Sequence, residues 1–370
     1  MTFDTNATSH SDAGGASAKR SALGVLAPFI RWEMLLLIIL VATILIGNWA
    51  SGDFLTGLNF SNSINNAMEV AIMALAMAPI IITGDIDLSV ESMVGLSGAV
   101  MGALWAGLTP FGMVPLPIAI VIALLVGVIL GLFNGILVTR WGLPALVVTL
   151  GTLALYRGLA KVLMGTNVVT NLPGGYTDFA FKNIPGTFIP WTFPTFLILA
   201  VIFWAVMHKT WIGRQIFAIG KNKSAARYSG VRVGTTRTAL FVVAGFVAAL
   251  AGIILALRFD SVRSSNGINM TLTVVTIAVL GGIDINGGKG TITGVVLAVL
   301  TLAAVQSVLR LVGVSAYIDA AVGFLLIFSV TAPLLARKTQ SLFNRGRLGG
   351  QSPGTGPQRE SFGQKRGGGV

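Results

Sequence analysis

Few residues in this chain could take part in catalysis or hold a metal ion. Only 13 of its 370 residues are Asp or Glu, and it has no cysteine, which excludes disulfides and thiolate metal sites. The two histidines, His10 and His208, cannot form a zinc site with each other, and no His-Glu-x-x-His motif is present. We therefore do not expect this chain to be an enzyme.

The run most similar to a phosphate-binding loop is Gly287-Gly288-Lys289-Gly290. A P-loop requires Gly-x-x-x-x-Gly-Lys-Ser/Thr, whose lysine and hydroxyl contact the phosphates and Mg²⁺. Here glycine follows the lysine, and Ile283 stands where the first glycine should be. The sequence predicts no ATPase site and no cofactor on this chain.

Several polar residues lie within or at the ends of apolar runs, where an ion costs about 2.5–3.5 kcal/mol. Such residues are candidates for lining a solute path. Glu69 could instead snorkel or pair at a helix interface, and the two aspartates could serve only as helix caps. The candidates for the path are Asn62, Asn65, Asn66, Glu69, Asp87 and Asp284.

The elements that must position these residues are membrane helices. The chain is 54% hydrophobic and only 10% charged, with a mean hydropathy of +0.84, whereas soluble domains carry about 25% charged residues. We expect an all-α polytopic membrane protein of about ten transmembrane helices, the eighth of which is short and could be a re-entrant half-helix. The apolar runs are 34–50, 64–83, 88–108, 116–139, 143–164, 192–208, 238–258, 271–282, 291–311 and 316–336.

The net charge of +12 has a simpler explanation than nucleic-acid binding. With ten spans and the N-terminus inside, 19 Lys and Arg residues fall on the inner side and 6 on the outer side. This split follows the positive-inside rule and predicts that both termini are cytoplasmic. The expected organisation is a disordered tail (1–32), a membrane domain (33–337) and a disordered basic tail (338–370).

Two further patterns concern helix packing and repetition. Gly127, Gly131 and Gly135 fall four apart, a spacing that lets helices approach closely, either within the chain or at a subunit contact. The segment 84–89 reads Gly-Asp-Ile-Asp-Leu-Ser, and the segment 281–286 echoes it as Gly-Gly-Ile-Asp-Ile-Asn. We expect each aspartate to cap the helix that follows. Matching breaks in the two halves of a chain are typical of transporters with internal repeats, although so short an echo could arise by chance.

The longest inner loop, 209–237, is basic and contains a short helical signal. Ser224 is the predicted N-cap of a helix over 225–228, and Gly230 suits the left-handed position that ends it. The alternative is a solvated basic loop without a partner. Its distinctive residues are Gly213-Arg214, Ala218-x-Gly220-x-Asn222, Ala225-Ala226 and Ser229-Gly230-Val231.

This loop closely resembles the cytoplasmic coupling loop of sugar-type permeases of bacterial ATP-binding-cassette importers. Three further stretches match that family in order, and the resemblance covers about residues 34–336. The stretches are Gly84-x-Ile86-Asp87-Leu88-Ser89, then Pro144-Ala145 with Thr149-Leu150-Gly151-Thr152 and Arg157-Gly158, then Leu280-Gly281-Gly282 with Gly287-Gly288-x-Gly290.

The resemblance implies the importer permease fold, with two related halves, in the bacterial inner membrane. It implies that two permease chains, identical or different, form the pore within membrane lipid. A dimer of cytoplasmic ATPase subunits would hydrolyse ATP and dock on the coupling loop, and a periplasmic or extracellular binding protein would deliver a monosaccharide or similar solute. The impression is closest to the rhamnose and autoinducer-2 branches, with ribose and xylose also possible. The alternative is an ion-coupled secondary sugar transporter working alone.

The chain departs from the family at one place. The family usually has Gly-Gly-Ile-Asp-Leu-Ser-Val-Gly-Ser, whereas this chain has Asp85 in place of the second glycine and Glu91 in place of a later one. The departure adds two acidic groups where the backbone is usually bare. It favours a chain that works beside a non-identical permease.

Overall fold

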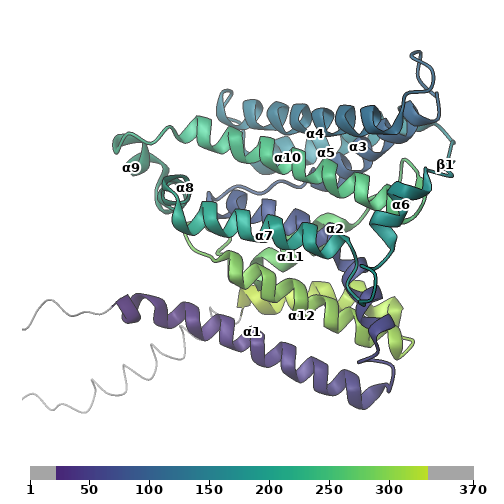
Figure 1. Cartoon of the computed structure of the whole chain (residues 1–370). Helices are drawn as coiled ribbons and strands as arrows, with labels where there is room; N and C mark the ends of the chain where they lie inside the picture. Colours follow the sequence, from purple (N-terminus) through teal and green to yellow (C-terminus); the bar gives the residue numbers. More distant parts are fainter. Residues whose placement is uncertain (1–21, 332–370) are drawn as a thin grey trace, which may run out of the picture.

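The computed structural model describes residues 22–331, with side chains from Trp32 onward. Over these residues the protein is a bundle of helices that run roughly along one axis (Figure 1). Seven helices in this part of the chain are long and apolar enough to cross a membrane. They are α1 (Ala22–Ala50), α2 (Gly57–Ile82), α4 (Leu116–Thr139), α5 (Ala145–Met164), α7 (Thr192–Lys209), α10 (Val233–Arg258) and α12 (Ile292–Leu311).

Three shorter apolar helices account for the other predicted spans: α3 (Val90–Trp105), α11 (Met270–Leu280) and a helix over Ser315–Thr331 that opens with the 3-10 turn η1 (Ser315–Tyr317). At 1.5 Å per residue, α11 is only about 16 Å long, roughly half the hydrocarbon thickness. The eighth span is therefore a half-helix, and irregular chain over 263–269 leads into it from β2 (Ser261–Val262). The prediction of an all-α polytopic membrane protein is confirmed.

The two ends of the bundle carry different short elements (Figure 1). One end carries α8 (Trp211–Lys221) and α9 (Lys223–Tyr228), which lie in the predicted inner loop. The other end carries α6 (Gly174–Phe181), β1 (Val169–Thr170) and β2 (Ser261–Val262). The two strands are antiparallel, with Val169 opposite Val262. Below, these are the α8–α9 end and the α6 end.

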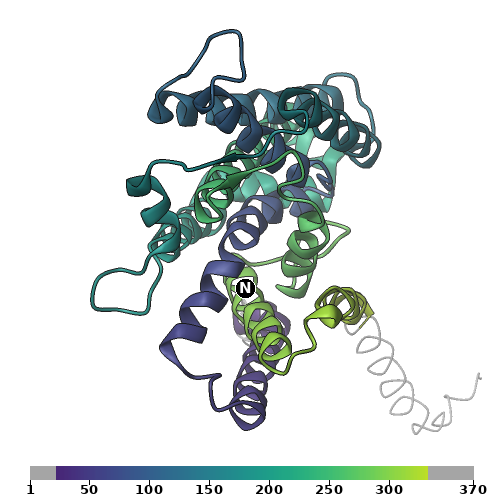
Figure 2. The ribbon, with the colours of Figure 1, turned by 90° about the vertical axis from the view of Figure 1, so that its right-hand side faces the viewer.

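The core of the bundle is built around two helices. The most apolar windows of α2 and α10 are 89% and 72% buried, whereas that of α1 is only 11% buried. Helix α1 packs mainly along α12 at the edge of the bundle (Figure 2). The large apolar side chains that remain exposed on α1, α4, α5 and α7 form the surface that lipid would cover.

The glycine stripe of α4 packs against α10. A Cβ atom at Gly127 would collide with the carbonyl oxygen of Gly245, and one at Gly131 would collide with that of Phe241. A Cβ at Gly135 would lie 3.0 Å from the Cα of Thr238. The four-residue spacing therefore serves a close contact within the chain, which resolves the alternative left open above.

The chain boundaries differ from the prediction in one respect. Helix α1 already begins at Ala22, so the boundary expected at residue 33 lies inside this helix. The sequence is apolar over most of 22–30, which allows the helix to extend beyond the predicted span. The remainder of the expected N-terminal tail and the whole of the C-terminal tail lie outside the described residues.

Candidate coupling site and solute path

Helix α8 is anchored to the bundle through its small and apolar residues. Gly213, Ile216 and Ile219 are buried, and a Cβ at Gly213 would collide with the carbonyl oxygen of Met207 in α7. The close turn between α7 and α8 therefore requires glycine at position 213. Arg214, on the other face of α8, is exposed.

Helix α9 is capped by Asn222 and not by Ser224, which corrects the prediction. The Asn222 side chain accepts a hydrogen bond from the Ala225 backbone N–H at 3.0 Å. Asn222 also ends α8 in an extended conformation, so a single residue breaks one helix and starts the next. The predicted ending is confirmed: Gly230 follows the helix with φ +82°.

Some residues of the predicted coupling loop pack against the bundle (the seated group), and others are exposed (the exposed group). Ala226 is buried in a small apolar cluster with Ile219 and Val233, separate from the main core, and Ala218 packs against that cluster. Ala225 and Ser229 are exposed and joined by a hydrogen bond from the Ser229 hydroxyl to the Ala225 carbonyl at 3.0 Å. The α8–α9 end therefore presents a small helical surface outside the bundle.

Gly220 lies where three parts of the chain meet. A Cβ there would collide with the carbonyl oxygen of Ile82, at the end of α2, and with the backbone nitrogen of Gly288. Gly288 in turn donates its N–H to the same Ile82 oxygen at 2.8 Å. The end of α8 is thus in close backbone contact with the end of α2, just before segment 84–89, and with the turn just after segment 281–286.

The two echo segments adopt the same local turn. The Asp87 carboxylate accepts from the Ser89 N–H at 2.8 Å, and the Asp284 carboxylate accepts from the Asn286 N–H at 3.0 Å. Neither aspartate is the N-cap of the next helix, because Ser89 and Thr291 occupy those positions. The capping prediction was wrong, since each carboxylate closes a turn before the helix begins.

Asp87 lies in a buried polar network within the bundle. Its carboxylate also accepts from the Ser89 hydroxyl at 2.6 Å, and that hydroxyl accepts from Asn134 of α4 at 2.8 Å. Tyr156 of α5 donates to Asn134 and to the carbonyl of Leu130. These bonds tie the start of α3 to α4 and α5.

The polar residues of α2 point in different directions. Glu69 is 1% exposed and forms a two-pronged ion pair with Arg258 of α10 at 2.7 and 3.3 Å. Arg258 also donates to Asn66 at 3.0 Å, and Asn66 lines a small pocket between α2, α11 and α12 together with Thr273 and Gln306.

The remaining candidates for the path lie elsewhere. Asn65 is buried and accepts from Thr192 of α7 at 3.1 Å, while Asn62 is exposed. Asp284 lies half-buried at the α8–α9 end. The structure therefore brings Asn66 and Glu69 together and leaves the other four candidates apart. Among the described residues, no group of three or more His, Asp or Glu side chains could hold a metal ion.

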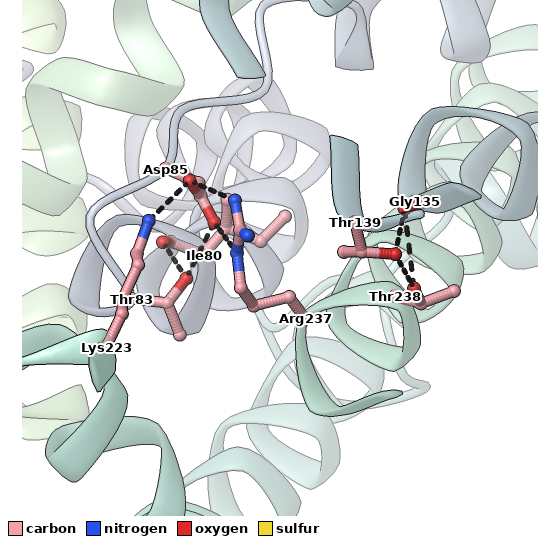
Figure 3. A network of polar contacts seen from close by, with 8 residues as sticks. All are labelled: Ile80, Thr83, Asp85, Gly135, Thr139, Lys223, Arg237 and Thr238. Atoms are coloured by element: carbon pink, nitrogen blue, oxygen red, sulfur yellow. Dashed lines mark hydrogen bonds and ion pairs between the residues drawn. The ribbon is translucent and has the colours of Figure 1, made fainter. Parts of the chain in front are cut away.

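Sequence reasoning missed the partners of Asp85. This residue is 6% exposed and accepts two hydrogen bonds from Arg237 of α10, at 2.6 and 2.8 Å (Figure 3). Lys223 of α9 donates to the same carboxylate at 3.2 Å, and Thr83 donates at 3.3 Å (Figure 3). An acidic residue in place of a glycine was the signal in the sequence, but the sequence did not identify its partners.

Glu91, the second departure, is also engaged. Its carboxylate lies 3.5 Å from the guanidinium of Arg157 and accepts from the Thr271 N–H, in the first turn of α11, at 3.1 Å. Arg157 also donates to the carbonyls of Ser264 and Asn266, on the irregular chain before α11. Glu91 and Arg157 thus hold the half-helix and the chain leading to it. A carboxylate at a helix N-terminus is favourable because it meets unpaired N–H groups and the positive end of the dipole.

Comparisons with known proteins agree with this architecture. Residues 59–330 match the family described as the permease component of branched-chain amino acid transport systems. The chain is 35% identical over 307 residues to the autoinducer 2 import system permease protein LsrD of Yersinia enterocolitica, covering 81% of this chain and 90% of the relative. The LsrD proteins of Yersinia pseudotuberculosis and Yersinia pestis are similar to the same extent. No solved structure matches the chain.

The family match spans most of the membrane bundle, including both echo segments and α8–α9. This agrees with the resemblance based on the coupling loop, and the apolar helices agree with a multi-pass protein of the inner membrane. Members of this family are transport permeases that act with ATPase and binding-protein partners. The chain therefore belongs to the family of permease subunits of ATP-binding-cassette sugar importers.

Proposed function

We propose that this chain is one of the two pore-forming permeases of an importer for autoinducer-2 or a similar small, sugar-like solute. The observation that carries the proposal is the 35% identity to autoinducer 2 import permeases over 81% of the chain and 90% of the relative. Because the match includes most of both proteins, the likeness is not confined to a shared motif. Rhamnose, ribose and xylose remain the nearest competing solutes.

The orientation that we propose places the α8–α9 end and both termini in the cytoplasm. The support is the distribution of charge, since the loop that contains α8 and α9 is rich in Lys and Arg. In this orientation the exposed residues Arg214, Ala225 and Ser229 face a docked ATPase dimer. The seated residues Gly220 and Ala226 carry the movement of the ATPase into the bundle.

The solute path in this proposal passes the pocket that Asn66 lines, between α2, α11 and α12. The pocket has few polar groups, which suits a chain that moves a solute selected by a separate binding protein. Glu69 contributes by fixing Arg258 next to Asn66 rather than by binding the solute itself.

The test begins with purification of the tagged chain from its own membranes in mild detergent. Mass spectrometry should find an ATPase with a P-loop and a binding protein in the complex. A second permease in equal amount would show that the pore is heteromeric, and its absence would indicate a homodimer. The complex is then placed in liposomes with its binding protein and ATP, and uptake of autoinducer-2, rhamnose, ribose, xylose and leucine is compared.

We expect ATP-dependent uptake that is highest for autoinducer-2. Preference for another sugar would keep the importer and replace the solute. Preference for leucine would contradict the sugar-type assignment. A chain that purifies alone and takes up sugar under an ion gradient without ATP would be a secondary transporter, and the proposal would be wrong.

A further inference from the structure

We propose that Asp85 is a positioning residue that couples helix α9 to the broken segment between α2 and α3, through its ion pairs with Lys223 and Arg237. The inference rests on the proposed function, because it assigns to these three residues the transmission of movement from the docked ATPase. These ion pairs are a second connection between the α8–α9 end and the bundle, in addition to the backbone contact of Gly220.

The first step in the argument is the position of the carboxylate. Asp85 lies three residues after the end of α2 and five before the start of α3, in the segment that joins these helices. Its side chain is 5% exposed, and Arg237 pairs with both of its oxygens. A buried carboxylate bound in this way fixes the direction of the segment, because a displaced segment would leave an uncompensated charge.

The second step is that Arg237 is attached to a fixed part of the bundle. The neighbouring residue Thr238 faces Thr139 of α4, with their hydroxyl oxygens 2.7 Å apart (Figure 3). The same stretch of α10 receives the glycine stripe of α4 at Gly135. Arg237 therefore provides a stationary anchor for Asp85.

The third step is that α9 has little else to hold it. This helix has six residues, and only Ala226 among them is buried. Its apolar attachment is the small cluster with Ile219 and Val233. Lys223 forms the one ion pair from α9 to the bundle within the described residues, and its side chain is 44% exposed. A movement of α9 is thus communicated to Asp85 through Lys223.

The fourth step is that the echo segment 281–286 lacks these ion pairs. In the echo segment the position of Asp85 is taken by Gly282, whose φ is +86°. Asp284, the counterpart of Asp87, bonds only within its own turn. The ionic connection to α9 therefore belongs to the first segment alone, which makes Asp85 a specific feature and not a general requirement of the fold.

The test compares D85N with D178N as a matched control. D178N removes an exposed ion pair of similar length, the 2.8 Å pair of Asp178 in α6 with Lys182 just after this helix, at the opposite end of the bundle. The first readout is uptake per ATP hydrolysed by the complex in liposomes. We expect D85N to lower this ratio about tenfold, within the range of typical couplings between sites, and D178N to leave it unchanged.

The second readout does not depend on transport. The chain has no cysteine, so Y228C and W141C introduce two unique spin-label sites, on α9 and on the loop between α4 and α5. Both positions are exposed, at 93% and 69%. In the full chain in lipid nanodiscs, we expect a narrow distance distribution that D85N broadens and D178N does not.

The combined outcomes decide the proposal. A broad distribution with a lowered ratio in D85N supports it. A narrow distribution, or an unchanged ratio, overturns it. If the unmodified complex shows no ATP-driven uptake, the proposed function fails, while the label distances still decide whether Asp85 holds α9. If D85N does not accumulate, K223M removes only the exposed arm of the network and is judged by the same criteria.

Discussion

Substitution of Gly220 by alanine tests the contact between α8 and the end of α2. The new Cβ would collide with the backbone of Ile82 and of Gly288. These are main-chain atoms, so they cannot rotate aside as the end of a flexible side chain could. Either α8 shifts away from the bundle, or the end of α2 and the loop at 284–290 shift together.

The magnitude follows from two opposing terms. Overpacking of a tight contact costs about 1–3 kcal/mol. Replacing glycine by alanine within a helix stabilises by about 1 kcal/mol. Gly158 of α5 supplies the matched control, because it is exposed and a Cβ there would meet nothing within 4 Å. The helix term is common to both variants, so G220A should be less stable than G158A by about 1–3 kcal/mol.

The assay has two parts. Unfolding in mixed micelles, followed as the fraction of denaturing detergent rises, gives the difference in free energy between the two variants. Uptake per ATP hydrolysed in liposomes gives the effect on coupling, and we expect G220A to lower it while G158A does not. G220V should have the larger effect on both. If G220A were as stable as G158A and coupled normally, the contact between α8 and α2 would not transmit movement.

The remaining predictions concern the path, the cap and the helix contact. E69Q removes the negative charge that pairs with the partly buried guanidinium of Arg258, so unfolding titrations should show a loss of about 3 kcal/mol. If uptake per folded complex were unchanged, Glu69 would not belong to the path. N222A removes the cap of α9 and should speed hydrogen exchange of that helix about fivefold, since a cap contributes about 1 kcal/mol, whereas S224A should change nothing. G131L blocks the approach of α4 to α10 and should prevent accumulation of folded protein, measured by fluorescence-detected size exclusion; normal accumulation would contradict the close contact.

The sequence predicts the helices well because membrane spans are local features. Each apolar run corresponds to a helix, and the length of the run marks α11 as exceptional. Whether a run of about 11 residues forms a half-helix or part of a longer one depends on what precedes it. Here the preceding chain is held by Arg157, a residue far away in the sequence, so the hydropathy pattern does not decide the question.

Caps and ion pairs are harder to predict for a related reason. Both Asn222 and Ser224 are good N-caps, and the choice depends on where α8 ends, which Gly220 fixes by its contact with α2. The partners of Asp85 are up to 152 residues away. The sequence shows that Asp85 is an unusual acidic residue at its position, but only the folded structure shows that Arg237 lies next to it.

The two departures from the family pattern act at both ends of the same segment. Asp85 ties its beginning to α9 and α10, and Glu91 ties its end to α5 and α11. The segment between α2 and α3 is therefore held by ion pairs between side chains. These ion pairs must separate before the segment can move.

The second segment is held differently. At 281–290, which is this segment and the turn after it, the structure shows no ion pair, and close backbone approaches at glycine join it to the rest of the described bundle, such as the bond from Gly288 to the carbonyl of Ile82. Losing one such bond costs about 1 kcal/mol, less than breaking a buried ion pair. During a transport cycle the segment at 281–290 should therefore move more readily, and the segment at 83–89 should stay attached to α10 as long as its ion pairs hold. The acidic residues thus give the two halves of one chain unequal roles.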